Sequence, residues 1–211
     1  MILFAPEYDD QTRACAPIAE HIARSDGSDA LLRGEQAIRG GLLRELRKKG
    51  AQACMIFSHG SPDEICGQDG ITALVPDDFR SLGPVAVFAY SCHSAFFGRE
   101  AHQQQRVWWG YDKSMVPPPD VVRTADVESI FRYIAHRFDG CSSPEQVKRV
   151  IEEIHDRCQH YVARYRKNHR ASMASAVFFM QLWTRLRVWT PWSTTPIAHE
   201  QSWTGDLDDA I

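Results

Sequence analysis

Short apolar runs alternate with amphipathic stretches over the first half of the chain. Ile2–Ala5, Ala53–Phe57 and Val85–Tyr90 are apolar throughout and have the length of strands. Strands that are apolar on both faces are typical of a parallel sheet covered by helices on each side. Stretches with helical periodicity lie between these runs, at about Thr12–Arg24 and Gln36–Lys49. The alternation predicts an α/β fold with a mostly parallel sheet.

Shorter signals complete this half of the chain. A turn is predicted at Gly67–Gly70 and a short helix at about Pro76–Leu82. A further helix is expected over Ser94–Gln104 and a last strand over Arg106–Tyr111. Pro117–Pro119 then ends the pattern, because consecutive prolines join neither a helix nor a central strand.

Beyond the prolines the pattern becomes helical. Ser143 is a good N-cap residue and Pro144 suits the first helical position, and apolar residues then recur every three or four positions as far as Tyr165. Met173–Val188 is predicted to be another helix. The chain from Pro191 onward is rich in Thr, Ser and Pro, and we expect it to be loose.

The charge of the chain changes sign where the pattern changes. Of the net charge of −3, residues 1–129 carry −5, residues 130–190 carry +6 and residues 191–211 carry −4. We therefore expect three parts, namely a catalytic core over 1–120, a helical extension packed on that core over 121–190, and a loose acidic tail over 191–211.

Composition narrows the class of protein. The chain is 44% hydrophobic, which excludes a wholly disordered protein. No run approaches the roughly 18 apolar residues of a membrane span, and Met1 leads directly into Ile2–Ala5 without the basic segment of a signal peptide. The 6 cysteines are scattered with no CxxC pair, as expected of reduced thiols. We expect a cytoplasmic protein that does not bind membranes.

Two of the apolar strands end in reactive residues. Ala53–Phe57 is followed by Ser58-His59-Gly60, and Val85–Tyr90 is followed by Ser91-Cys92-His93. Because the carboxyl ends of neighbouring parallel strands meet at one edge of a sheet, His59 and Cys92 are expected to face the same crevice. A thiolate is the nucleophilic form of cysteine, and an imidazole beside it can shuttle its proton. The pair therefore indicates a nucleophilic site.

The surroundings of the two residues fit that chemistry. Cys92 would lie at the start of the helix beginning at Ser94, where free backbone N–H groups favour a thiolate and a developing oxyanion. Gly60 would let the backbone approach a substrate carbonyl closely. The alternative is that Cys92 only packs, as most intracellular cysteines do.

An apolar strand ending in His59-Gly60, an insert, and an apolar strand ending in Ser91–Ala95 together resemble the caspase-like cysteine peptidases, which include caspases, metacaspases, gingipain-type enzymes and CHAT-domain proteases. The Cys-His-Ser-Ala run is most similar to metacaspases, and Ile71–Phe79 is similar to the insert of CHAT domains. The opening Ile2–Ala5 suits the first strand of that fold. The resemblance covers roughly residues 1–115 and implies a caspase-like α/β/α sandwich, here with a helical C-terminal extension.

The resemblance also implies a role for each residue. Cys92 would be the nucleophile that forms a thioester, and His59 would be the general acid and base. The backbone N–H groups of Gly60 and Cys92 would form the oxyanion hole. No cofactor is implied. The substrate would be a protein. Short members of the group often work with partners that activate them, frequently in stress or defence systems, so a regulatory or activating protein partner is expected. A prokaryotic origin is also expected.

One departure concerns the residue that would bind the substrate side chain. Metacaspases place an Asp two residues before the cysteine to bind a basic side chain, whereas this chain has Tyr90 there. Specificity for basic residues is therefore not carried over from that position. Asp112, after the last strand, and Asp9 or Asp10, after the first, could supply an acid at the same rim. The alternative is that these acids are only solvated.

Two other groups of residues suggest weaker sites. His155, Cys158 and His160 cluster in one predicted helix, but His160 lies off the face that the other two share and no fourth ligand follows, so no metal site is expected. His93 could rival His59 as the base, although adjacent residues after a strand usually diverge.

The helical half combines basic and aromatic residues, mainly in Tyr161–Arg170 and Phe178–Trp192. Such a combination can bind single-stranded nucleic acid or dock a protein, but packing of the aromatic rings on the sheet explains it better. Two competing functions remain open. One is a catalytically silent caspase-like scaffold or adaptor that binds a protein or nucleic acid through this half. The other is an unrelated flavodoxin-like module with a cofactor at the sheet edge.

Overall fold

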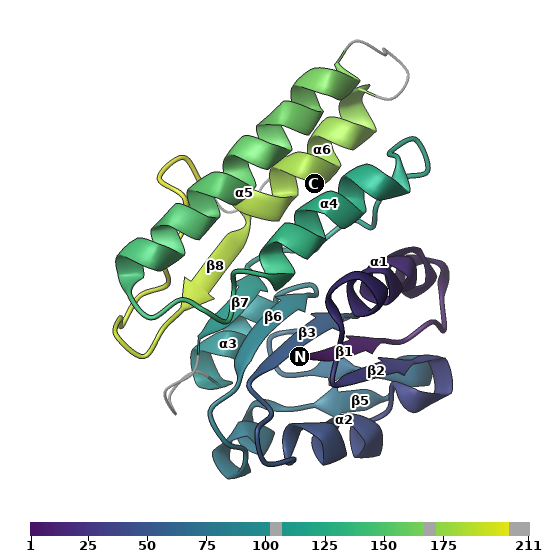
Figure 1. Ribbon diagram of the computed structural model, residues 1–211, viewed down its shortest axis with the longest axis vertical. Coiled ribbons are helices and arrows are strands. Elements are labelled where there is room, and N and C mark those ends of the chain that lie inside the picture. Colours follow the sequence, from purple (N-terminus) through teal and green to yellow (C-terminus); the bar gives the residue numbers. More distant parts are fainter. Residues whose placement is uncertain (102–106, 167–171, 203–211) are drawn as a thin grey trace.

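A six-stranded sheet with the order β2-β1-β3-β6-β7-β8 forms the centre of the computed structural model, which describes residues 1–101, 107–166 and 172–202 (Figure 1). Its strands are β1 (Ile2–Ala5), β2 (Ala30–Arg33), β3 (Ala53–Phe57), β6 (Ala86–Tyr90), β7 (Trp108–Tyr111) and β8 (Leu186–Trp189). All neighbouring strands are parallel except β8, which runs antiparallel to β7. The predicted α/β class and the mostly parallel sheet are confirmed.

Helices cover both faces of this sheet (Figure 1). One face packs against α1 (Asp10–Asp26), α4 (Thr124–Ala135), α5 (Pro144–Tyr165) and α6 (Ser172–Thr184). The other packs against α2 (Arg39–Leu46), α3 (Ser94–Ala101), the hairpin of β4 (Ile65–Cys66) and β5 (Thr72–Leu74), and a 3₁₀ helix over Pro76–Ser81. Because side chains alternate along each strand, a strand that is apolar throughout contributes to both cores.

Several predicted helices and turns are present at the predicted positions but begin or end at other residues. The helix expected over Gln36–Lys49 is shorter, because Ile38 is extended and α2 begins only at Arg39. A 3₁₀ helix over Gly34–Gln36 precedes it, and another over Gln68–Gly70 occupies the predicted turn. Residues 102–106, where the predicted helix Ser94–Gln104 would end and the last strand begin, lie outside the described residues.

The helix expected over Met173–Val188 is wrong only at its C-terminal end, after Thr184. The helix α6 ends at Thr184, and Leu186–Trp189 forms β8 on the open edge of β7. Leu186 and Val188 are buried while Arg187 is only partly so, which is the alternation of a strand. Pairing with β7 supplies backbone partners that a lengthened helix would not use.

Within residues 191–202, Ile197, His199 and Ser202 are buried against the fold, although the sequence predicted a loose tail from Pro191. Ile197 exchanges two backbone hydrogen bonds with Val188, of 2.8 and 2.9 Å, and His199 and Ser202 are buried. Residues 203–211 lie outside the described residues. The division of the chain into three parts stays a prediction, with β8 of the expected helical extension belonging to the main sheet.

The aromatic rings of the basic helical half lie mostly in the core. Phe178, Phe179 and Trp183 are buried, and Tyr161 stacks on Phe179 with 5.2 Å between ring centroids. This is the arrangement that the packing interpretation expects. No helix of the described residues is both long enough and apolar enough to cross a membrane.

Candidate active site

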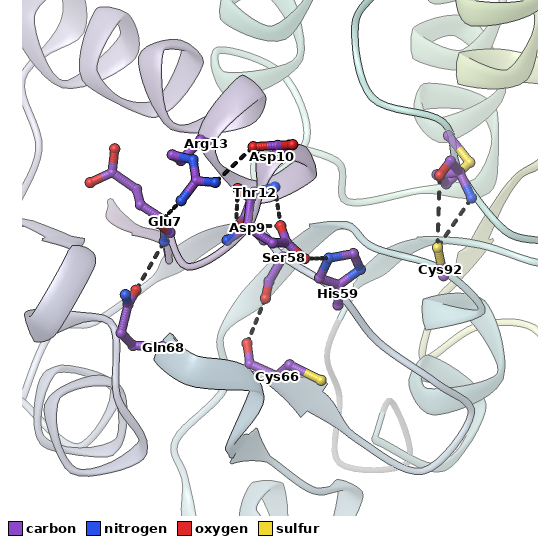
Figure 2. Close-up of polar contacts among 11 residues, drawn as sticks. Glu7, Asp9, Asp10, Thr12, Arg13, Ser58, His59, Cys66, Gln68 and Cys92 are labelled. Atoms are coloured by element: carbon purple, nitrogen blue, oxygen red, sulfur yellow. Dashed lines mark hydrogen bonds and ion pairs between the residues drawn. The ribbon is translucent and has the colours of Figure 1, made fainter.

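His59 and Cys92 lie at the same edge of the sheet because β3 and β6 are parallel neighbours. The register pairs Phe57 with Tyr90, the last residue of each strand, so the chain leaves both strands at one level. Both residues line one pocket of about 330 Å³, which includes space open to solvent. The N-terminal end of α1 forms one wall of the pocket, and Met115 and Pro117 form part of another. Figure 2 shows the two side chains at this edge.

A carboxylate holds the imidazole of His59. The Nε2 atom of His59 lies 2.7 Å from Oδ2 of Asp9, the N-cap residue of α1 (Figure 2). A neutral imidazole that donates from Nε2 to Asp9 keeps its lone pair on Nδ1, where it can accept a proton. The sequence offered Asp9 as an acid for the substrate, but the structure pairs it with His59.

The Asp9 carboxylate is also fixed by the helix that it caps. The backbone N–H and the hydroxyl of Thr12 both donate to Oδ1 of Asp9, each over 2.8 Å. Burial opposes ionisation of this carboxyl, but the hydrogen bonds from Thr12 and His59 outweigh burial, and the pKa of Asp9 lies below its usual value. Asp9 therefore carries a negative charge beside His59 at neutral pH.

This lowered pKa predicts how stability depends on pH. A carboxyl whose pKa is lowered in the folded state stabilises that state above its unfolded pKa, near 3.9, and this contribution is lost as the pH falls through the folded pKa. Between pH 7 and pH 3 the wild type should lose more free energy of unfolding than Asp9→Asn, whose amide oxygen can still cap α1. Urea unfolding at pH 7, 5 and 3 measures the difference.

Asp10→Asn is the matched control for this prediction. The neighbouring Asp10 side chain is 99% exposed and pairs with Arg13 across 2.7 Å, so its removal should leave the pH dependence close to that of the wild type. Equal losses in Asp9→Asn and the wild type would contradict the prediction.

The sulfur of Cys92 accepts a backbone hydrogen bond. The N–H of Met115 donates to Sγ of Cys92 over 3.2 Å, and the thiol is half-buried. His93 follows with a φ of 55°, in the left-handed region, and α3 then begins at Ser94. The Nε2 atom of His93 lies 3.2 Å from the hydroxyl of Ser114, and His93 does not line the pocket.

The loops after β3 and β6 bring backbone N–H groups to this edge. The loop after β3 is tied to β4 through the N–H groups of Ser61 and Cys66, which donate over 2.9 and 3.0 Å. Within the described residues, the N–H groups of Gly60 and Cys92 donate to no acceptor. Cys92 lines the pocket and Gly60 lies next to it in the loop after His59, but is not part of the lining.

Gly60 is in close contact with the loop that carries Cys92. A Cβ atom at position 60 would collide with the Ser91 hydroxyl and lie 3.2 Å from the carbonyl oxygens of Cys92 and Glu64. Only a residue without a side chain fits there.

Gly60→Ala should therefore lower the free energy of unfolding by about 1–3 kcal/mol, the usual cost of overpacking. Adding Ser91→Ala should recover part of the loss, since the Ser91 hydroxyl has no hydrogen-bond partner among the described residues. Gly40→Ala, which meets nothing within 4 Å, should instead be neutral or stabilising. Urea unfolding of the four proteins measures this, and a Gly60→Ala protein as stable as the wild type would refute it.

Of the other predicted substrate residues, Tyr90 lines the pocket, whereas Asp112 and Asp10 do not. The Tyr90 side chain is buried, and its hydroxyl donates to the carbonyl of Val116 over 2.7 Å. Asp112 forms an ion pair of 2.5 Å with Arg187 of β8, although burial raises the pKa of its carboxyl. Asp10 faces solvent. None of the three offers an unpaired acid to a substrate.

The histidine cluster of α5 has partners that the sequence did not indicate. His155 stacks on His199 from the C-terminal segment, with 4.4 Å between centroids, and potential ligand atoms of these two and Glu152 lie within 4.8 Å of one another. His199 already uses both nitrogens, because Nε2 lies 3.0 Å from Glu152 and Nδ1 accepts the N–H of Gln201 over 3.1 Å. These contacts attach the C-terminal segment to α5 through His199.

The fold and the site together define a class: an α/β protein whose parallel sheet brings a cysteine and a carboxylate-bound histidine to one pocket at its carboxyl edge. Comparisons of the chain with protein-family models, curated proteins and solved structures find no match.

Proposed function

We propose that this protein is a caspase-like cysteine endopeptidase that uses Cys92 and His59. The observation that carries the proposal is the shared pocket at the ends of β3 and β6. There the backbone N–H of Met115 donates to the sulfur of Cys92, and the carboxylate of Asp9 lies against Nε2 of His59. The layered α/β architecture and the order of the two motifs along the chain are compatible with that group.

In the first step the Cys92 thiolate attacks the scissile carbonyl carbon. A C–S bond forms, the carbonyl π electrons move to oxygen, and the N–H groups of Gly60 and Cys92 donate to the resulting oxyanion. The intermediate collapses with cleavage of the C–N bond, and the protonated His59 gives its proton to the leaving amine. The products are a free amine and a thioester on Cys92.

In the second step water hydrolyses the thioester. His59 removes a proton from the water as it attacks, the C–S bond breaks, and a carboxylic acid and the Cys92 thiolate are released. In the described residues His59 and Cys92 do not hydrogen-bond to each other. The missing hydrogen bond between His59 and Cys92 is compatible with the mechanism. The substrate would lie between the two side chains, and catalytic contacts often tighten only when it binds.

A panel of peptide acyloxymethyl ketones tests the proposal. The probes differ in the residue next to the warhead, and peptide mass mapping locates the modified cysteine. Capture at Cys92 that depends on the peptide and is absent in Cys92→Ala supports the proposal, and the best probe gives the specificity. Cys66→Ala is the matched control, because Cys66 is also half-buried and its carbonyl is bonded to Ser58 beside the pocket. Equal capture of Cys66 and Cys92 by every probe, with no peptide preference, would refute it.

A further inference from the structure

The segment from Lys113 to Pro117 bonds directly to the candidate nucleophile. Met115 supplies the N–H that donates to Sγ of Cys92. Its side chain and that of Pro117 also belong to the pocket wall. The position of this segment therefore decides whether Cys92 has its hydrogen-bond donor.

The helical half of the chain holds this segment through one amide side chain. Gln181 of α6 accepts the N–H of Val116 at Oε1 over 2.9 Å and donates from Nε2 to the carbonyl of Val116 over 2.7 Å. The same carbonyl accepts the Tyr90 hydroxyl. Gln181 thus bonds both backbone groups of the residue that follows Met115.

Burial makes this pair of bonds specific. Gln181 is 2% exposed, in a helix with no charged residue, so an amide there without partners would destabilise the fold. The Val116 side chain is 43% exposed, so Gln181 holds its backbone and not its side chain. Pro117 restricts Val116 to extended conformations, in which successive N–H groups point to opposite sides. Because the N–H group of Val116 points to Gln181 on α6, the N–H group of Met115 points to the opposite side, where Cys92 lies.

We propose that Gln181 is a positioning residue for Cys92, because its two bonds to Val116 keep the Met115 N–H on the sulfur and so stabilise the thiolate. Its importance for catalysis rests on the proposed function. The effect on the thiol itself does not, and can be measured without any peptide substrate.

Other groups also surround the sulfur and the segment. The titratable groups nearest Cys92 lie on α1, on β6 and its following turn, and on the loop after β3 as far as β4, and they are Cys15, His59, Cys66, Tyr90 and His93. Arg185 donates to the carbonyl of Ser114. Gln181→Met removes the two hydrogen bonds to Val116 and a longer one of 3.4 Å from Nε2 to the Tyr90 hydroxyl, while it keeps the side-chain length and replaces none of these residues.

The experiment is alkylation of Cys92 by iodoacetamide across pH 5–10, read by peptide mass mapping in the wild type and in Gln181→Met. We expect the Cys92 rate at pH 7 to fall about fivefold, the value of one ordinary hydrogen bond, with the pH profile displaced to higher pH and the limiting rate at high pH unchanged. Cys66 in the same digest should keep its rate. Met180→Leu, at a neighbouring exposed position, is the control and should match the wild type.

An unchanged Cys92 profile in Gln181→Met would overturn the proposal, and so would a rate raised equally at every pH, which would mean that the segment only shields the sulfur. Tyr90→Phe provides a second variant if Gln181→Met does not fold. It removes one bond to Val116 and should displace the profile in the same direction by less; no displacement would again overturn the proposal. If no peptide probe is captured at Cys92 but the pH profile of Cys92 alkylation is displaced in Gln181→Met, the proposed peptidase function is refuted and the role of Gln181 is supported.

Discussion

Replacing His59 with alanine should lower the rate at which a peptide probe is captured at Cys92 by about 10²–10⁴-fold, the usual contribution of a general acid or base. The reason is the arrangement at the edge of the sheet. His59 and Cys92 line the same pocket, and Nε2 of His59 is bonded to Asp9. Without the imidazole, none of the other side chains that line the described pocket is an ordinary general base for the proton of the Cys92 thiol. The measurement is the second-order rate constant with the best peptide probe.

A histidine far from the pocket provides the control. His136 follows α4, its side chain is 53% exposed and it lies 3.0 Å from the Asp26 carboxylate, so His136→Ala should react at the wild-type rate. Asp9→Asn should fall between the wild type and His59→Ala, because the imidazole remains but its orientation is less restricted. A His59→Ala protein that captures the probe at the wild-type rate would exclude His59 as the acid or base, and His93 would become the candidate.

Replacing Trp108 with alanine should lower the free energy of unfolding by about 3–5 kcal/mol, the usual cost of removing a buried aromatic side chain. Trp108 is fully buried in β7, stacks on Phe97 at 4.9 Å and meets Phe79 edge to face at 5.4 Å. Its Nε1–H also donates to the carbonyl of Ser94 over 2.9 Å. The substitution leaves a cavity and removes one hydrogen-bond donor from that carbonyl, and urea unfolding measures the loss.

Two further substitutions, one at Trp108 and one at Trp192, separate these effects. Trp108→Phe keeps most of the volume but loses the bond to Ser94, so it should lose clearly less stability than Trp108→Ala. Trp192→Ala removes a side chain that is 47% exposed and should change stability by less than about 1 kcal/mol. Because Ser94 begins the helix that follows Cys92, Trp108→Phe should also slow probe capture. A Trp108→Ala protein as stable as Trp192→Ala would contradict the assignment of this core.

The sequence was most informative where a strand is apolar on both faces. The strands β1 and β3 have the predicted ends, and β6 begins one residue later than predicted, because a short apolar run between polar segments fits only the interior of a covered sheet. The positions of His59 and Cys92 follow from those strands, since parallel neighbours end at one edge.

Elements that depend on distant partners were missed. The edge strand β2 has an apolar run of only Ala30, Leu31 and Leu32 before Arg33 ends it. The strand β8 looks helical in sequence and is a strand only because β7 offers an open edge. The helix α4 carries Val127, Ile130, Phe131 and Ile134 at helical spacing, and this signal could have been found.

The partners of the site residues also depend on the fold. Asp9 and His59 are 50 positions apart, and Val116 and Gln181 are 65 apart, and no local pattern specifies such pairs. One local signal does exist for Asp9, because Thr12 three residues later forms a capping box with it. That box identifies Asp9 as an N-cap residue with an occupied carboxylate rather than a free acid at the rim.

The late position of β8 and α6 in the chain has a consequence during synthesis. A nascent chain that has left the ribosome only as far as α5 contains His59, Cys92 and five parallel strands, but the outer edge of β7 has no partner and Val116 has no Gln181. An unpaired edge of this kind invites association with other chains. The thiol gains its complete surroundings only once almost the whole polypeptide has emerged, so translation itself delays the appearance of a finished site.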